Sequence, residues 1–523
     1  MLERAKESMK QSTMKWDEGQ IFPTFTYKGA TLDAVESSSM NRDELLAYAT
    51  LQGIVNRSEI RMLLLDMHSD QGGDTWPTTA GLSYVRSDFL SVFKKYYTEA
   101  DGVVLFSLEK SHHYLNLACT AASTRNAIPM TEGLYNRLMG EGLLMPVVED
   151  LTTFTMTDPK EIYTYAYEKY WQKNTHRLLI SQNPHEVFHL RDVIAAAGCA
   201  VLFTENRRDE DRAVYERFLA DMEPGKAICM GWYTEERSGV TTATSFGLST
   251  VPGDLFCNYT VYAQDKPIHY RPEVDLPALE NKIYCAPFIS DGDNVQYIQR
   301  FMRKYWDNYR DSRGKSCINW TVSPSLVDIA PDILNYYYDT ATDKDCFVSG
   351  PSGLGYAMAV NTLAEEIEAK NYVRDDECYA EYVKLSNRYC KRAGLSAITV
   401  WDNLTENQRE IFGKYATDLE GITVQLFTDD RESITSEANG LPIKQMTPCY
   451  TCTIEHWMNV LTREFKSWDG NSPKFIACQI AVWNQIKPND IPVIEERMKE
   501  MTGGRFEFVR ADVFFKLMRE AKK

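Results

Sequence analysis

The stretch KIYCAPFI-SDGDN, residues 282–294, decides the fold of the second half of the chain. Its first eight residues form an apolar run that predicts a buried strand, and the polar SDGDN predicts a turn that leads into a helix near Val295. Amphipathic helices separate further apolar strands of the same kind. These predicted strands are 317–322, 345–349, 397–401, 421–427, 474–480 and 505–509, with a weaker one near 443–446. Seven or eight such βα units predict a (β/α)7–8 barrel-like domain.

Short apolar runs also alternate with helices before residue 240, which predicts an N-terminal α/β domain with a mainly parallel sheet. Residues 241–280 break this rhythm, because Pro252, Pro267, Pro272 and Pro277 disfavour helix. We therefore expect three segments. They are an N-terminal α/β domain at 1–240, an irregular or β-rich connector at 241–280, and a C-terminal barrel-like catalytic domain at 281–523.

The charge and hydropathy of the sequence exclude some classes of binding partner for the chain. The 523 residues include 57 Lys and Arg against 74 Asp and Glu, a net charge of −17, and no dense basic run. Phosphate contacts need clustered basic side chains, so we expect no nucleic-acid partner. The longest apolar run, Ile194–Phe203, is too short to span a membrane. The oligomeric state stays open.

The N-terminus MLERAKESMKQST has no apolar segment of the signal-peptide kind. The 12 cysteines are scattered, mostly in strand-like runs, as is typical of buried free thiols. Both observations favour a cytoplasmic protein, with a periplasmic or secreted one as the alternative if the chain has been trimmed.

A barrel places its active site where the βα loops converge, at the carboxyl ends of the strands. Polar or acidic residues follow nearly every predicted strand. The candidate catalytic residues are Asp291, Asp293 and Asp402. The candidate substrate-binding residues are Asn294, Ser323, Ser325, Ser352, Gly353, Gly355, Tyr356, Trp401, Asp429, Asp430 and Gln479.

The two carboxylates of SDGDN could hold a cation, bind sugar hydroxyls or act as general acid and base. The alternative is a turn that only caps the next helix. The presence of two aspartates favours a functional role for this turn, because a single Asp or Asn suffices to cap a helix. The loop GPSGLGY, residues 350–356, would let backbone approach a ligand and Tyr356 stack on a ring, although a plain tight turn would use the same glycines.

Metal and cofactor signals are poor. The single CxxC at Cys449–Cys452 has no second pair, and the second half holds only two histidines, His269 and His456. We therefore predict neither a bound metal nor a cofactor.

Four motifs occur in the order in which a known family has them: LQGIVNR at 51–57, SDGDN, NWTVSPS at 319–325 and GPSGLGY. In these the chain resembles the GxGYxYP family of putative glycoside hydrolases, known mainly from gut Bacteroidetes, and the resemblance covers most of the chain. It implies a carbohydrate substrate. The chain departs from the family name after Tyr356, where Ala357, Met358 and Ala359 replace the pattern that would supply a second Tyr and a Pro.

The leading hypothesis is hydrolysis of a glycosidic bond in a neutral glycan by an SDGDN carboxylate together with Asp402. The two carboxyls would lie about 5–5.5 Å apart for retention or about 6.5–9.5 Å apart for inversion. One alternative is a glycan-binding protein without turnover. Another is a metal-dependent hydrolase or deacetylase with Mg²⁺ or Ca²⁺ at Asp291 and Asp293.

Overall fold

The computed structural model describes residues 12–67, 72–271, 273–360, 373–425, 434–448, 450–481 and 483–523. Its contacts divide the chain into two compact units. The first comprises Met1–Pro267 with Ser325–Tyr336, and the second comprises Ile268–Pro324 with Tyr337–Lys523. Residues 241–267 of the expected connector therefore belong to the first unit and 268–280 to the second.

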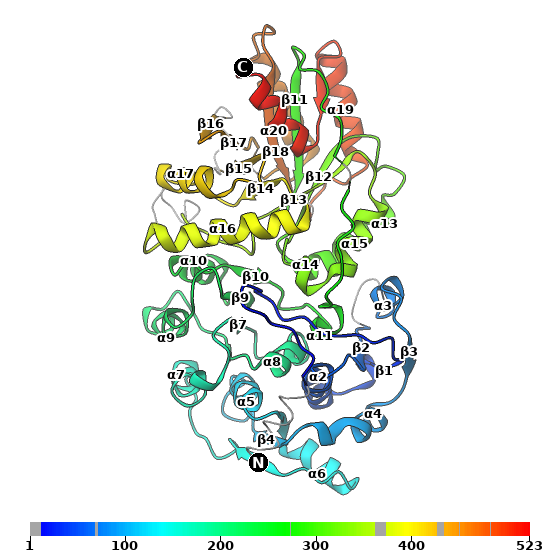
Figure 1. The fold of residues 1–523 in the computed structure, drawn as a ribbon, viewed down its shortest axis with the longest axis vertical. Coiled ribbons are helices and arrows are strands. Elements are labelled where there is room, and N and C mark those ends of the chain that lie inside the picture. Colours follow the sequence, from blue (N-terminus) through cyan, green and yellow to red (C-terminus); the bar gives the residue numbers. More distant parts are fainter. Residues whose placement is uncertain are drawn as a thin grey trace. The chain divides into compact units, whose positions relative to one another are not determined.

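The described residues of the first unit form three small parallel sheets where the sequence predicted one (Figure 1). Their strand orders are β2-β1-β3, β5-β4-β6 and β10-β9-β7-β8. The strands are β1 (Leu32–Glu36), β2 (Met62–Leu65), β3 (Tyr84–Arg86), β4 (Gly102–Phe106), β5 (Ala127–Thr131), β6 (Val147–Asp150), β7 (Leu178–Ser181), β8 (Val201–Leu202), β9 (Ile228–Gly231) and β10 (Thr250–Pro252). In each sheet the first strand lies between the second and the third. The unit is thus a threefold repeat of one βαβαβ topology, although no repeat is visible in the sequence.

Helices connect these strands, as parallel pairing requires. They are α2 (Arg42–Asn56), α3 (Thr75–Thr79), α4 (Phe89–Tyr96), α5 (Tyr114–Ser123), α6 (Glu132–Gly140), α7 (Pro159–Lys169), α8 (Arg191–Ala197), α9 (Asp209–Ala220), α10 (Glu236–Ser245) and α11 (Tyr259–Tyr262). The connector was expected to lack helix, yet α10 and α11 lie partly or wholly within it. Both are compatible with the prolines, because α10 ends before Pro252 and α11 before Pro267.

The LQGIVNR motif forms the end of α2 and holds the first unit together. Gly53 lies against the N-terminal turn of α8, where a Cβ atom would come 1.9 Å from the Asp192 carbonyl oxygen. Gln52 donates to Asn258 at 2.8 Å, and Asn56 donates to Thr260 at 3.1 Å. The motif is therefore explained by packing between helices from different repeats.

We predict that Gly53→Ala destabilises the chain by several kcal/mol, because the new methyl group would overlap the Asp192 backbone and the two helices would have to separate. Thermal or urea unfolding measures the change. The matched control is Gly133→Ala in α6, where a Cβ would meet nothing within 4 Å and the substitution should be neutral or slightly stabilising. Equal stability of the two variants would contradict this account of the motif.

The second unit is a curled sheet of parallel strands. Within the described residues the hydrogen-bonded path runs β17-β15-β14-β13-β12-β11-β18. These strands are β11 (Ile283–Ile289), β12 (Ile318–Val322), β13 (Asp345–Ser349), β14 (Ala397–Val400), β15 (Gly421–Val424), β17 (Leu441–Gln445) and β18 (Lys474–Ile480). Bridges Met446–Ala477 and Thr451–Ile480 join the end of β17 to β18, so the path returns on itself. The (β/α)7–8 barrel-like fold class is confirmed.

Two strands depart from the regular pattern. β16 (Thr435–Ala438) runs antiparallel to β17 at the edge, and β19 (Phe506–Phe508) pairs beside the first half of β11. The remaining helices are α12 (Val295–Tyr297), α13 (Arg303–Asn308), α14 (Leu326–Ile329), α15 (Pro331–Thr340), α16 (Asp376–Ala393), α17 (Glu406–Tyr415), α18 (Ile454–Lys466), α19 (Asp490–Met501) and α20 (Ala511–Glu520).

The core of this unit forms between α20 and the strands. Phe514 and Phe515 of α20 pack in one buried cluster with Tyr284, Ala286 and Phe288 of β11. These side chains occupy alternate positions of β11 and therefore one face of the strand. The expectation of buried free thiols also holds among the described cysteines: all eleven are free, and nine are buried.

Candidate functional site

The residues that follow the barrel strands are joined to one another by hydrogen bonds. The Trp483 indole N–H, after β18, donates to the Asp291 carboxylate after β11. The Gly292 amide donates to the Thr321 hydroxyl of β12 at 2.9 Å. The Gln425 side chain, after β15, donates to that of Gln479 in β18. The carboxyl ends of these strands thus meet at one rim, as the barrel predicts.

The acidic turn after β11 separates its capping residue from its acids. Asn294 alone caps α12, since its side chain accepts the Tyr297 amide at 3.0 Å. Asp291 is half-buried with φ +73°, and Asp293 is only 6% exposed. A Cβ at Gly292 would lie 1.8 Å from the Thr321 carbonyl oxygen, so glycine is required there. The cap of α12 is therefore supplied by the Asn294 side chain and not by either carboxylate of SDGDN.

Aromatic side chains surround Asp291. The Tyr297 ring packs edge-on against Trp483 with centroids 5.3 Å apart, and the Phe301 ring lies 4.6 Å from Trp483. Burial, followed by the nearby Asp291 charge, raises the pKa of Tyr297 well above its usual value. The Tyr297 hydroxyl therefore stays protonated. Trp483 is 48% exposed, so part of its indole ring is accessible to a ligand.

The glycine-rich loop after β13 packs largely against other parts of the unit. The Ser352 hydroxyl donates to the Ala357 carbonyl at 3.0 Å and accepts the Trp401 amide at 3.2 Å. A Cβ at Gly353 would come 2.5 Å from the Ser386 hydroxyl of α16. Tyr356 is 3% exposed. These contacts assign packing roles to residues that the sequence offered as ligand contacts.

Asp402 and its neighbours continue the rim. Asp402 is fully buried with φ +73°, and its carboxylate accepts the Asn403 amide at 2.8 Å. Trp401 is half-buried and packs edge-on against Tyr356 at 6.4 Å and Tyr450 at 5.8 Å. Tyr450 also contributes to the raised pKa of Tyr297, so it links Trp401 to the aromatic side chains near Asp291.

The remaining predicted residues differ in how they relate to this group. Gln479 is buried in β18 and belongs to the rim through its hydrogen bond with Gln425, whereas Ser323 is buried just after β12. Ser325 precedes α14, in the segment grouped with the first unit. Asp429 and Asp430 lie outside the described residues.

Sequence reasoning missed four residues at this rim: Tyr297, Tyr382, Gln425 and Tyr450. Burial raises the pKa of Tyr382 in α16, and the Asp293 charge adds to the effect, so the two side chains lie near each other. Tyr297 and Gln425 were read as ordinary helix and strand positions. Only the position of Tyr297 in the first helical turn after the acidic turn, and that of Gln425 one residue past β15, could have indicated them.

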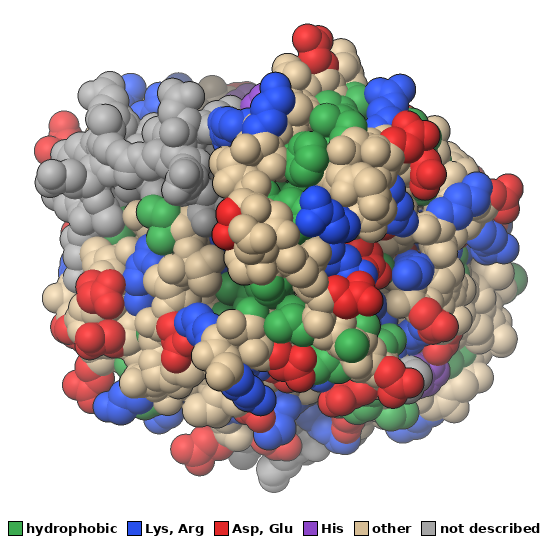
Figure 2. Space-filling view, turned by 90° about the horizontal axis from the view of Figure 1, so that it is seen from above, with side chains coloured by type: hydrophobic (Ala, Val, Ile, Leu, Met, Phe, Trp, Pro, Cys, Tyr) green, Lys and Arg blue, Asp and Glu red, His purple; other side chains and the backbone are tan. Residues whose placement is uncertain are grey.

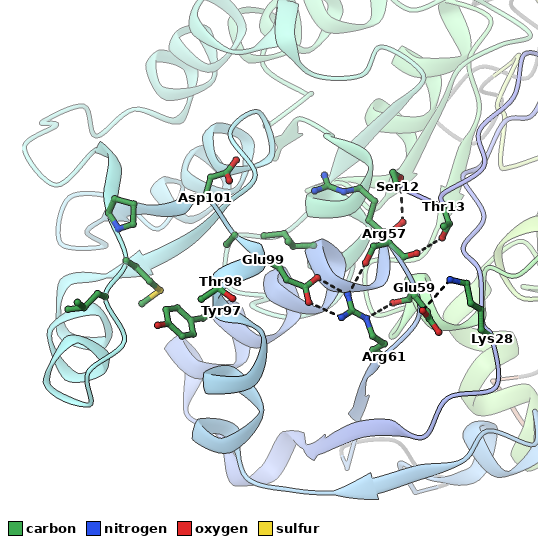
Figure 3. Close-up of a pocket in the computed structure, with 16 residues that line it drawn as sticks. Ser12, Thr13, Lys28, Arg57, Glu59, Arg61, Tyr97, Thr98, Glu99 and Asp101 are labelled. Carbon is green, nitrogen blue, oxygen red and sulfur yellow. Dashed lines mark hydrogen bonds and ion pairs between the residues drawn. The ribbon is translucent and has the colours of Figure 1, made fainter. Parts of the chain in front are cut away.

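A large cavity lies elsewhere, in the first unit (Figure 3). It has a volume of about 1130 Å³ and is lined by charged side chains of both signs. Arg61 pairs with Glu99 at 2.7 Å, and Lys28 pairs with Glu59 at 3.3 Å. Arg61 directly precedes β2, so the cavity lies at an amino end, whereas α/β sheets bind ligands at their carboxyl ends. We therefore do not place the candidate active site in this cavity.

Neither the charges on the surface nor the arrangement of possible metal-binding side chains in the described residues indicates a further site. Acidic and basic side chains are interspersed on the face shown in Figure 2. Across the described residues, no three His, Cys, Asp or Glu side chains are grouped so that they could hold a metal ion. Nor does any described helix have the length and apolar character needed to cross a membrane.

We predict that Thr321→Val loosens the acidic turn, because it removes the hydroxyl that accepts the Gly292 amide and donates to the Ile289 carbonyl. Hydrogen–deuterium exchange of a peptide covering residues 290–297 should become roughly threefold to tenfold faster, as expected when the Gly292 amide loses its one acceptor. Thr321→Ser keeps the hydroxyl and should leave the exchange unchanged. An equal rate in both variants would show that this contact does not hold the turn.

The fold and the rim define a class: an α/β protein with a parallel barrel whose carboxyl end carries carboxylates and aromatic rings. Family models match residues 100–174 ("GxGYxYP_N second domain"), 176–264 ("GxGYxYP third domain") and 281–519 ("GxGYxYP putative glycoside hydrolase C-terminal domain"). The chain belongs to the GxGYxYP family. The first two matched segments coincide with the second and third repeats of the first unit.

A solved structure, described as that of a putative hydrolase from Bacteroides thetaiotaomicron VPI-5482, has the same fold. It is 19% identical, with a TM-score of 0.77, over 97% of this chain and 98% of that one. A putative polysaccharide deacetylase from Mycobacterium smegmatis aligns with 6% identity and a TM-score of 0.30, over 49% of this chain and 96% of that one, too low to carry an argument. No curated protein matches the chain.

Proposed function

We propose that the chain is a glycoside hydrolase that cleaves a neutral glycan at the carboxyl end of its barrel. The observation that carries the proposal is the Asp291 carboxylate, which is half-buried, receives the Trp483 indole N–H and is not needed to cap a helix. Membership of a family described as putative glycoside hydrolases supports it.

The surroundings of the two carboxyls suggest how they divide the work. Asp291 accepts a hydrogen bond from Trp483, which favours its ionised form and suits a nucleophile or general base. Asp402 is fully buried, where a charge is costly, and suits the acid that protonates the leaving oxygen. Asp293, near Tyr382, is the substitute for either role. The separation of the two carboxyls in the substrate complex would set retention or inversion of the anomeric centre.

The aromatic side chains support a carbohydrate substrate. Trp483 contacts Asp291 and Trp401 directly precedes Asp402, and the apolar faces of sugar rings pack on such side chains. Carboxylates at the rim disfavour an anionic substrate, so a neutral glycan fits best.

We predict that Asp291→Asn and Asp402→Asn each lower kcat on a cleaved glycan by about 10²–10⁴-fold, since each removes one proton-transfer or nucleophilic group. Release of reducing ends from a panel of neutral oligosaccharides measures the change. Asp307→Asn, whose carboxylate is held by Arg303 in α13, is the control and should keep full activity. Turnover by both rim variants at the parent rate would refute the assignment.

The second candidate is a glycan-binding protein without turnover. Two observations favour this alternative: Asp402 is fully buried, and its carboxylate already accepts a hydrogen bond from the Asn403 backbone amide. If Asp402 has only this structural role, the second catalytic carboxyl is missing. If the chain only binds glycans, the unsubstituted chain hydrolyses none of them, and the Asp291→Asn variant binds glycans as tightly as the unsubstituted chain.

A further inference from the structure

Buried polar atoms without partners gather at the carboxyl end of the barrel. Among the described residues, they include the hydroxyls of Ser290, Tyr297 and Thr423, together with Gln425 Oε1 and Gln479 Nε2. A buried polar atom that forms no hydrogen bond costs folding free energy, so such atoms are few in native proteins and need an explanation. Four of these five atoms belong to residues in or next to the carboxyl-terminal parts of β11, β15 and β18, where a bound molecule with polar groups would complete them.

The two glutamines form the clearest part of this group. Gln425 donates to the side-chain oxygen of Gln479, and both side chains are 1% exposed or less. Backbone hydrogen bonds place the pair between the two acidic turns. The Gln425 amide donates to the Asp402 carbonyl at 2.9 Å, and Ser290, next to Asp291, donates to Ile480, next to Gln479, at 3.1 Å.

The mutual hydrogen bond leaves the pair with one amide oxygen and one amide nitrogen unused. This count does not depend on the orientation of the amides, because turning both of them exchanges the two glutamines and again leaves one acceptor and one donor. A hydroxyl group both donates and accepts, so one hydroxyl or two neighbouring hydroxyls can satisfy both atoms.

A charged group of a sugar placed against the pair cannot do the same. A carboxylate only accepts and would face the free amide oxygen, and an ammonium only donates and would face the free N–H group. In a buried site each mismatch leaves an unpaired polar group, which is how protein sites reject close analogues.

We propose that Gln425 and Gln479 form a hydroxyl-binding subsite that selects a neutral sugar ring over a uronic acid or an amino sugar. This inference rests on the proposed function, because it assumes that the acidic rim is where the glycan lies. It adds a specificity-determining pair, one member of which, Gln425, the sequence did not indicate.

The test uses the full chain carrying Asp291→Asn, so that binding is measured without turnover. The probes are cellotetraose, maltotetraose, xylotetraose, mannotetraose and galactotetraose, with tetra-glucosamine and tetra-galacturonate as charged counterparts. Affinities are measured by isothermal titration calorimetry. We expect at least one neutral tetrasaccharide to bind and neither charged probe to bind better.

Gln425→Met and Gln479→Met, added singly, should each weaken the best neutral probe by about tenfold or more, because methionine keeps the side-chain length and removes the polar atoms. The matched control is Gln445→Met, a buried glutamine at the end of β17 outside the pair, which should bind within about twofold of the parent. Thermal unfolding checks that each variant is folded.

Unchanged affinity in both glutamine variants would overturn the proposal and leave the pair as the site of an internal water only. Preferred binding of tetra-galacturonate or tetra-glucosamine, or no binding of any neutral probe, would also overturn it. Failure of the proposed function is a separate result: it appears as unchanged turnover in Asp291→Asn and Asp402→Asn, while glutamine-dependent binding persists.

Discussion

The contact between Gly292 and Thr321 is the constraint on which the candidate site depends. The Thr321 hydroxyl accepts the Gly292 amide and donates to the Ile289 carbonyl, and the Gly292 backbone lies too close to the Thr321 carbonyl for any side chain. This contact ties the acidic turn to the neighbouring strand. With the turn held by its backbone, the Asp291 carboxylate accepts the hydrogen bond of the Trp483 indole.

The other family-like motifs act in a similar way, through structure. Asn319 donates to the Pro287 carbonyl and accepts the Ala511 amide, which joins β11, β12 and the start of α20. Gly53 brings two helices of different repeats together in the first unit. Several of the residues by which the chain resembles its family therefore hold backbone segments close together, whereas the Asp291 carboxylate accepts the Trp483 indole at the rim.

The sequence predicted the second unit well because its signals are local. Strands β13 and β18 have the predicted bounds, and β11 and β12 each differ from their predicted ranges by one residue. The three-sheet division of the first unit could not be predicted, since parallel pairing depends on contacts between segments far apart in the chain and the repeats share no visible residues. The antiparallel β16 was missed because its side chains are mostly exposed and lack an apolar run.

At the candidate site, the sequence indicated the residues that directly follow strands and misjudged how buried they are. Tyr356 and Asp402 look like surface-loop residues in the sequence but are 3% and 0% exposed. Gln425 lies in an apolar stretch and gains meaning only from its partner Gln479, 54 positions away. Such pairs form only when the barrel closes, so no short sequence motif indicates them.

The central claim is that a neutral glycan binds at the carboxyl rim of the barrel, beside Asp291. Its most direct test is a crystal structure of the Asp291→Asn chain soaked with a mixture of neutral oligosaccharides. The account predicts sugar density at the rim, with a ring packed on Trp483 or Trp401 and hydroxyls within hydrogen-bond distance of residue 291. Sugar bound instead in the cavity beside Arg61, with an empty rim, would contradict it.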